Sequence, residues 1–541
     1  MSRFFFLALS VGLAGGLSAA PISAERIKAD VKQLSSDEFE GRGPGEAGDD
    51  KATTYLAGVF EKAGLEPGGE DNTFFQKVPL VRLDRLPGAT FTLKLAGKDF
   101  PLVLGRDASL ALKNEGRTTL KDVPLVFAGY GTVDSALGWN AYEGVDMAGK
   151  IAIVLANDPD FEAGRDLGFE GKRMAYAGRT GAKIEAALKA GAAGMLFIHE
   201  EAAASYPFSQ LGSGDALPTM ILAPLKPSDF KLSSWITGAV GEKILQQAGL
   251  TLAQLKERAR RPDFRAFPLK ETQLSVDAEV KATPFVSRNV IARLPGAAHP
   301  DEYILYGAHW DANGRNGPDK TGDDIRNGAV DNATGTAEVL EIARAFKAGK
   351  APQRTVLFAA WTAEEKGLLG SEFYASHPVY PLAKTVAVIN LDPHVVLPAA
   401  RDVELIGGGR TTLEDDFARA AKAQGLKVTP EPNPEAGWYF RSDHYPFAKR
   451  GVPALAFRAG RALVEGGPAA GQKIVSAYNA NCYHQPCDQL DPAWTFAGTV
   501  QEASVAFALG RELADTHEWP AWNSKSEYKA IRDETAAERT K

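Results

Sequence analysis

Apolar positions near the start of the chain repeat at the spacing of α-helices. They recur every three or four residues at positions 27–34 and again at positions 55–60. This spacing places apolar side chains on one face of a helix. The second helix is expected to end at Gly64, because glycine suits the position just after a helix C-terminus. The pattern therefore predicts that residues 25–85 are mainly helical.

The middle of the chain, residues 86–282, has a different pattern. Its apolar residues form short runs rich in β-branched and aromatic side chains, which favour strands. One helix is expected at residues 182–190, where the pattern ends at Gly191. The clearest strand candidates are residues 91–95, 123–127 and 151–155. This segment is therefore predicted to be β-rich.

The third part, residues 283–541, alternates apolar strands with helices. A helix is predicted at residues 333–346, between the first two strand candidates. Strand, helix and strand in this order are typical of an α/β layer. The strand candidates are residues 303–306, 355–360 and 386–391. We therefore expect an α/β fold with a mixed, mostly parallel sheet flanked by helices.

Length and composition narrow the class of protein. The chain has 541 residues, of which 44% are hydrophobic and 24% charged, close to the averages of globular proteins. At about 150 residues per domain, this length suggests two to four domains. The formal charge of −7 argues against a nucleic-acid partner, because such proteins carry basic surfaces. The 2 Cys are too few for a disulfide scaffold or an all-thiolate zinc site.

The first 24 residues are expected to be a secretory signal peptide. Arg3 precedes an apolar run from Phe4 to about Leu13, and small residues follow up to Ala24. A basic start, a short apolar core and a small-residue exit mark such peptides. No later stretch reaches the ~18 uninterrupted apolar residues of a membrane helix. We therefore expect an exported protein without stable membrane insertion, periplasmic if the host is a Gram-negative bacterium.

Polar segments of the third part stand at predicted strand ends or before the predicted helix. Taken singly, each has an ordinary explanation, such as polar packing for His309, a helix N-cap for Asp331 or a solvated turn for Glu364 and Glu365. Asp311 would share a strand face with His309 and could accept from its second ring nitrogen. The segments are Tyr306–Asp311, Gly322–Gly335, Trp361–Gly367, Ile389–Pro393 and Asn481–Asp488.

Together these segments supply five candidate metal ligands. Imidazole and carboxylate ligands without thiolate suit zinc, with cobalt or manganese as alternatives. Open α/β sheets place their sites outside the carboxyl ends of the strands, where most of these residues fall. A shared carboxylate can hold two metals about 3.5–4 Å apart with a hydroxide between them. The candidates are His309, Asp331, Glu365, Asp392 and His484. They predict a site for two zinc-like ions.

The same segments resemble the signature of the co-catalytic di-zinc exopeptidases. This is metallopeptidase family 28, which includes bacterial aminopeptidases and the glutamate carboxypeptidases. The resemblance covers nearly the whole chain after the expected signal peptide. It rests on residues 307–311, 327–335 and 362–367, and it continues through 34–45, 390–392, 441–447, 451–454 and 483–484.

The resemblance assigns each ligand to a metal. His309 and Asp392 would be terminal ligands of one zinc ion. Glu365 and His484 would bind the other, and Asp331 would bridge the two.

Two further carboxylates receive roles from the same resemblance. Glu364 would be the general base, which takes a proton from a metal-bridging water and returns it to the leaving amine. Asp311 would be the carboxylate behind His309. A cis peptide is implied between Asp331 and Asn332.

Three other side chains near these motifs are less defined. Tyr439 is a weak candidate for stabilising the oxyanion and is expected instead to be a core aromatic. His444 resembles a family residue that shapes the pocket without binding metal. His394 departs from the family pattern and has no assigned role.

The middle segment, residues 86–282, resembles the protease-associated domain inserted in many family members. Glycine-dependent turns carry this similarity, and they are less specific than the metal set. The insertion would interrupt the catalytic domain, which residues 25–85 begin and residues 283–541 complete. The turns lie at residues 127–131, 144–150 and 189–194.

Cys482 and Cys487 bracket His484. Because an exported protein meets oxidising conditions, we predict a disulfide that fixes the loop carrying this ligand. The alternative is two buried free thiols. So short a loop adds little stability through chain entropy, so the value of the bond would lie in positioning.

We expect a zinc-dependent exopeptidase that acts on peptides, and we favour an aminopeptidase that releases N-terminal residues. The alternative is a glutamate carboxypeptidase-like hydrolase, which needs cationic groups for two carboxylates. A glutaminyl cyclase-like enzyme would need only one zinc ion, and a non-catalytic binding member would have lost ligands, whereas all five positions are filled here. Cationic candidates near the motifs are Arg315, Arg326, Arg410 and Arg441.

Overall fold

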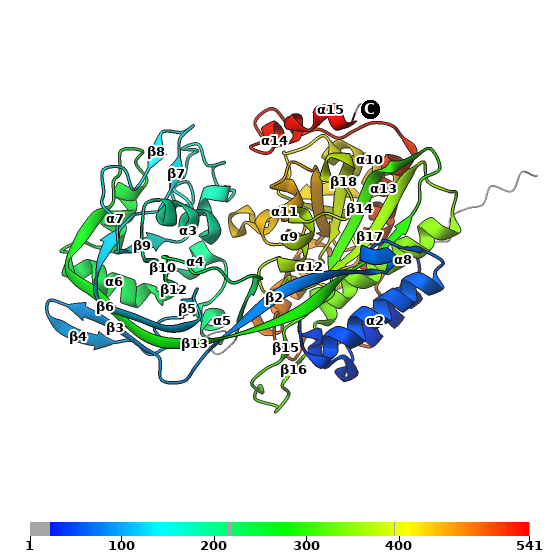
Figure 1. Cartoon of the computed structure of the whole chain (residues 1–541). Coiled ribbons are helices and arrows are strands. Elements are labelled where there is room, and N and C mark those ends of the chain that lie inside the picture. The colour runs from blue at the N-terminus through cyan, green and yellow to red at the C-terminus, as the bar shows by residue number, and fades with distance from the viewer. Residues whose placement is uncertain (1–21, 214–217, 394, 540–541) are drawn as a thin grey trace, which may run out of the picture.

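The computed structural model describes residues 22–213, 218–393 and 395–539, so the expected signal peptide lies almost entirely outside the described residues. Two lobes are joined by a ribbon of long strands (Figure 1). Helix α1 (Ala24–Leu34) begins at an N-cap, Ser23, whose side chain accepts a hydrogen bond from the Arg26 N–H. The expected cleavage point after Ala24 therefore falls in the first turn of this helix. No described helix is both long and apolar enough to cross a bilayer.

The larger lobe is built on a mixed sheet whose four central strands are parallel. In spatial order they are β17 (Arg354–Trp361), β14 (His299–His309), β18 (Thr385–Leu391) and β21 (Ala454–Ala459). Antiparallel strands flank them, β13 (Phe267–Leu294) beside β17 and β19 (Asp402–Ile406) beside β21, and β20 (Lys427–Pro430) runs parallel to β19. The three predicted strands all lie in the parallel core. The expected mixed, mostly parallel sheet is confirmed.

Helices cover both faces of this sheet, because successive side chains of a buried strand point to opposite faces. Ile304 and Tyr306 enter one core, whereas Leu305 enters the other. The first core also holds side chains of α1, α2 (Ala47–Lys62), α8 (Gly335–Ala348), α10 (Leu413–Ala423) and α13 (Ala497–Asp515). The second holds α9 (Leu369–Ser376) and α11 (Tyr445–Ala448). The predicted helix at 333–346 corresponds to α8.

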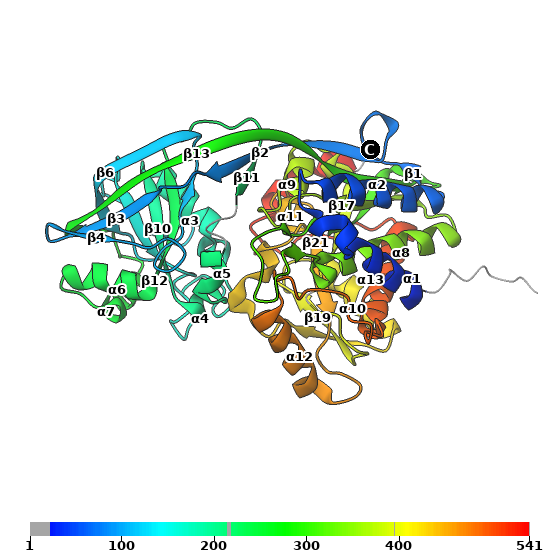
Figure 2. The same cartoon turned by 90° about the horizontal axis from the view of Figure 1, so that it is seen from below.

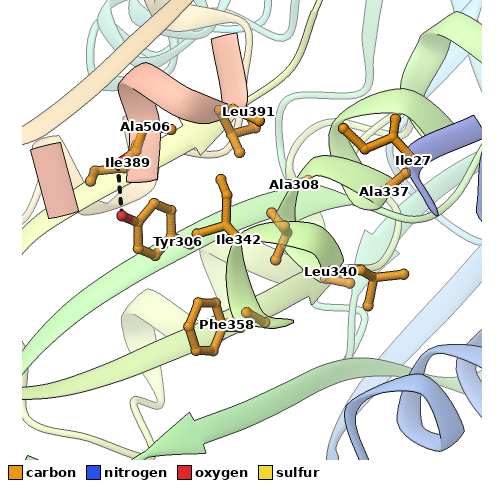
Figure 3. Close-up of a cluster of buried hydrophobic side chains, with 14 of the residues drawn as sticks. Ile27, Tyr306, Ala308, Ala337, Leu340, Ile342, Phe358, Ile389, Leu391 and Ala506 are labelled. Atoms are coloured by element: carbon orange, nitrogen blue, oxygen red, sulfur yellow. Dashed lines mark hydrogen bonds between the residues drawn. The ribbon is translucent and has the colours of Figure 1, made fainter. Parts of the chain in front are cut away.

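The first core is tightly packed around Tyr306 (Figure 3). Its ring stacks on that of Phe358 with centroids 5.7 Å apart. Its hydroxyl donates to the main-chain oxygen of Ala506 at 2.8 Å, so the one polar atom of this side chain is satisfied although the residue is fully buried. This contact attaches α13 to the middle of β14.

The smaller lobe has its own β-rich core, as the composition predicted. Helices α3 (Thr180–Lys189), α6 (Gly238–Gln247) and α7 (Leu252–Ala259) pack with its strands. The main strands are β3 (Thr90–Leu95), β6 (Gly116–Phe127), β9 (Ile151–Leu155), β10 (Gly194–His199) and β12 (Leu232–Thr237). The predicted strands and the predicted helix at 182–190 lie within β3, β6, β9 and α3.

The expectation that residues 25–85 are mainly helical is wrong for their last part. Residues Phe75–Arg85 form strand β2, which pairs antiparallel with β13 from Val280 to Val290. Alternate β2 side chains such as Val78 and Leu80 are buried, a period of two that the helical interpretation overlooked.

Strand β13 is 28 residues long and belongs to both lobes. It pairs with β3 and β6 in the smaller lobe, then with β2, and finally with β17 in the larger lobe. Figure 2 shows this strand running between the two lobes beside β2. The boundary expected at residue 282 therefore falls inside a continuous strand. The amino-acid composition changes at this point, but the backbone hydrogen bonds between β2 and β13 continue across it.

We predict that Gly510→Ala destabilises the larger lobe. A Cβ at this position in α13 would lie 1.7 Å from the Tyr306 hydroxyl oxygen. Such overpacking typically costs about 1–3 kcal/mol of unfolding free energy, measurable by denaturant titration. Gly58→Ala in α2 is the matched control, because nothing lies within 4 Å of its Cβ. Adding Tyr306→Phe should restore part of the loss. Equal stability of the two glycine variants would contradict the close approach.

Candidate metal centre

The five candidate ligands come together at the carboxyl edge of the parallel strands. Three lie at strand ends, where parallel strands deliver their side chains to one edge. His309 ends β14, Glu365 follows β17, Asp392 follows β18, Asp331 lies in a helical turn (Ala329–Thr334) before α8, and His484 follows α12 (Gly467–Asn481).

Asp331 lies between the two histidines. Its Oδ1 is 3.2 Å from His309 Nε2 and its Oδ2 is 3.2 Å from His484 Nε2. His484 Nε2 is also 3.0 Å from Glu365 Oε2, and His309 Nε2 is 3.7 Å from Asp392 Oδ1. Zinc bonds of about 2.1 Å in a tetrahedron place neighbouring ligand atoms about 3.4 Å apart. The side chains thus form two groups of zinc-compatible donors that share one carboxylate.

The two adjacent glutamates point to different groups. Glu365 faces His484, whereas Glu364 Oε2 lies 3.9 Å from His309 Nε2. Glu364 is near enough to His309 and Asp392 to complete a three-ligand set. Asp331, however, is closer to His309 than Glu364 is. The geometry thus distinguishes two carboxylates that the sequence presents as equivalent neighbours.

Asp311 contacts this centre differently from the sequence expectation. The nearer partner of His309 Nδ1 is the main-chain oxygen of Asp311, at 3.0 Å, and the carboxylate Oδ1 lies 3.7 Å away. A ring nitrogen that donates to a carbonyl leaves Nε2 with a lone pair for a metal. The Asp311 carboxylate accepts from the Glu364 N–H at 3.0 Å. Asp311 therefore orients the backbone of Glu364 as well as the ring of His309.

Asp392 is held by a short chain of hydrogen bonds. Ser442 Oγ donates to Asp392 Oδ2 at 2.6 Å, and Asn390 Nδ2 donates to Ser442 Oγ at 2.7 Å. Because Oδ2 is engaged, Oδ1 is the oxygen that faces His309.

Two residues that received no role from the sequence hold the Asp331 turn. The carboxylate of Asp488 accepts from the N–H groups of Val330 and Asp331, at 2.9 and 3.1 Å. Arg42, which is fully buried, donates to the main-chain oxygens of Asn327 and Gly328 just before the turn. Asp488 ends the polar segment Asn481–Asp488, and Arg42 lies within the N-terminal part of the family resemblance, at residues 34–45. Nothing in their local sequence indicates these contacts.

The loop that carries His484 has three distinctive features. Cys482 and Cys487 are joined by a disulfide with a Cα–Cα distance of 5.1 Å. His484 itself has a φ of 59°, which is uncommon for a residue other than glycine. The ring of Tyr483 stacks on that of His484 with centroids 3.8 Å apart. In the neighbouring turn, the Asp331–Asn332 peptide is cis, as the family resemblance implies.

The centre carries a buried excess of negative charge. Burial raises the pKa of Asp311 and of Asp443 to about 7, and it raises the pKa of Glu364 well above its ordinary range. For His484, burial lowers the pKa, but Glu365 and Asp331 outweigh it and raise the pKa to about 10. In the absence of a cation, protons compensate the carboxylates. Divalent cations would replace these protons, which agrees with the imidazole and carboxylate donor set.

A cleft of about 640 Å³ opens onto the centre and is lined by both lobes. Tyr439 does not line it but lies in the second core, with Arg410 over its ring, as expected for a core aromatic. His444 lines the cleft, and burial lowers its pKa to about 3, so it is neutral. Tyr483 lines the cleft beside His484. His394 lies outside the described residues.

Known proteins share this sequence pattern and fold. Residues 289–508 match the model of peptidase family M28. A glutamate carboxypeptidase 2 homolog from Caenorhabditis elegans is 31% identical over 34% of this chain and 26% of its own length. Leupeptin-inactivating enzyme 1 from Streptomyces exfoliatus is 28% identical over 41% of this chain and 47% of its own length. The chain thus matches about a quarter to a half of these relatives.

A solved structure shows the same fold over most of the chain. The aminopeptidase from Aneurinibacillus sp. strain AM-1 superposes with a TM-score of 0.52 at 20% identity, covering 93% of this chain and 97% of its own. The family match spans β14, β17 and β18 and all five candidate ligands. The part of this chain that is similar to peptidase family M28, residues 289–508, therefore contains the whole candidate centre.

Proposed function

We propose that this protein is a zinc-dependent exopeptidase with two zinc ions per chain, and that it acts as an aminopeptidase. The observation that carries the proposal is the position of Asp331, with one carboxylate oxygen 3.2 Å from each of two imidazoles. One ion would be held by His309 and Asp392, the other by Glu365 and His484, with Asp331 shared.

The chemistry divides between the ions and the chain. Bound zinc ions supply Lewis acidity toward a carbonyl oxygen and lower the pKa of a water molecule. Glu364 is placed to accept the proton of that water at Oε2 and to donate it to the leaving amine. The Asp311 carboxylate keeps Glu364 in place by accepting a hydrogen bond from the main-chain N–H of Glu364.

The walls of the cleft favour the end of a peptide over its middle. Tyr176 and Arg179 from the smaller lobe line the same cleft as Glu364. Glu364, Glu365 and Asp392 make the wall of the cleft acidic at the candidate centre, and this charge attracts a free α-ammonium group, which supports the aminopeptidase assignment.

One observation favours a carboxypeptidase as the second candidate. Arg179 and Arg441 both line the cleft. Burial, followed by the positive charge of Arg441, lowers the pKa of Arg179 to about 10. Two neighbouring guanidinium groups attract an anion, and the C-terminal carboxylate of a peptide is such an anion.

We also propose that the chain contains an inserted domain and that it is exported. A separate core in the smaller lobe supports an inserted protease-associated domain within residues 86–282. The Cys482–Cys487 disulfide supports an oxidising compartment such as the periplasm.

Free dipeptides and their N-acetylated copies, incubated with the purified protein and analysed by mass spectrometry, separate the two candidates. An aminopeptidase should cleave the free dipeptides and leave the acetylated copies intact, because acetylation removes the α-ammonium group. Cleavage of acetylated copies, lost on C-terminal amidation, would instead support the carboxypeptidase. Cleavage of neither set by zinc-loaded protein would overturn the exopeptidase proposal.

Asp331→Ala should remove about two zinc ions per chain relative to the wild-type protein, because its carboxylate is shared. Elemental analysis after dialysis gives the difference. Asp263→Ala, a change at an exposed aspartate paired with Arg261, is the control and should retain the wild-type count. A loss of one ion or none in Asp331→Ala would contradict the shared-carboxylate arrangement.

Glu364→Gln and Glu365→Ala should fail in different ways. Glu364→Gln should keep the zinc count and melting temperature, while kcat falls by at least the ~10²–10⁴ typical of a lost general base. Glu365→Ala removes a ligand, so zinc content and melting temperature should fall together. If Glu364→Gln loses metal and Glu365→Ala keeps it, the two roles are reversed.

A further inference from the structure

Strand β14 carries a histidine at each end. His309 lies at its carboxyl end in the candidate centre, and His299 begins the strand at the opposite edge of the sheet. Their partners on β17, Arg354 and Trp361, are seven positions apart, or about 23 Å at ~3.3 Å per residue. The amino end is therefore remote from the peptidase cleft.

A second group of metal-ligating side chains gathers at this remote end. His299 and Glu302 come from β14, and His517 follows α13. Each offers one ligand atom, and the three atoms lie within 4.8 Å of one another. His517 Nε2 is 3.3 Å from Glu302 Oε1, close to the separation of about 3.4 Å between ligand atoms of tetrahedral zinc. The two imidazole rings are tilted by 35° to each other, with centroids 4.4 Å apart.

One buried arginine holds this group in place. Arg354, at the start of β17, is fully buried and donates to Glu302 Oε2. It also donates to the main-chain oxygens of Leu513 and Glu518, on either side of His517. Arg354 thus holds both the Glu302 carboxylate and the segment that carries His517. Because Arg354 engages Glu302 Oε2, Oε1 is the oxygen that faces His517. This is the type of outer support that ordered metal ligands have.

The exposure of these side chains suits a bound ion that keeps some coordination positions open to water. Glu302 is buried, whereas the His517 side chain is 64% exposed, so water can complete the coordination. The charge of Arg354 offsets that of Glu302, so affinity should be lower here than at the carboxylate-rich centre around Asp331.

We propose that His299, Glu302 and His517 bind one zinc-class divalent cation, distinct from the peptidase centre. Two imidazoles and one carboxylate without thiolate suit zinc, with nickel or copper as competitors. The ion joins the start of β14 to the segment after α13. It acts as a structural clamp and takes no part in peptide hydrolysis.

His517→Ala tests this site, because an exposed side chain can be removed without disturbing the core. Equilibrium dialysis against zinc chloride should show one ion fewer per chain than the wild-type protein at saturation. His299→Ala should show the same loss. His377→Ala removes an exposed histidine at the end of α9 and should keep the wild-type count. Added zinc should raise the melting temperature less in His517→Ala than in the wild-type protein, with peptidase activity unchanged.

Equal zinc counts in His517→Ala, His299→Ala and the wild-type protein would overturn the site. An equal effect of zinc on the melting temperatures of His517→Ala and the wild-type protein would overturn the clamp. Because each count is a difference from the wild-type protein, the result does not depend on how many ions the peptidase centre holds or on whether peptides are cleaved.

Discussion

The candidate centre depends on one largely buried carboxylate, that of Asp331, whose side chain is 13% exposed and is held between two imidazoles. A buried charge is costly unless it is paired and hydrogen-bonded, and the surrounding structure meets this condition from several directions. Asp488 accepts the N–H of Asp331, and Arg42 fixes the residues just before its turn. His309 and His484 face its two oxygens. Removing any of these supports would leave a charged group or backbone donor without its partner in the protein.

This constraint explains why distant parts of the chain must meet. Arg42 comes from the first sixty residues, His309 from the middle of the sheet, and Asp488 from a loop near the end. The smaller lobe lies between the first and second of these in sequence, and the β2 and β13 ribbon brings the chain back without a break. The same ribbon sets the smaller lobe against the cleft, where Arg179 lines the wall opposite the metal ligands. Lobe placement and site geometry are thus parts of one architecture.

Parallel strands also give the sheet two chemically different edges. Residues just beyond the carboxyl ends converge on the candidate centre, whereas the amino ends carry structural contacts such as the Glu302–Arg354 pair. A strand with polar residues at both ends can therefore serve both edges, as β14 does. The rigidity of its apolar middle, packed on both faces, keeps the two ends independent.

The sequence alone determined what depends on local pattern and residue type. It predicted the parallel strands, because continuous apolar runs are needed for burial on both faces, and it identified the ligand candidates at their ends. Only the tertiary structure decided which atoms meet. The nearer partner of His309 Nδ1 proved to be the main-chain oxygen of Asp311 and not its carboxylate, and the supports of Asp331 proved to be Asp488 and Arg42. The second group, with His517, was also invisible in sequence. Apart from His309 and Asp311, these contacts join residues more than a hundred positions apart, and their distances follow from how the layers pack and not from any periodicity of the chain.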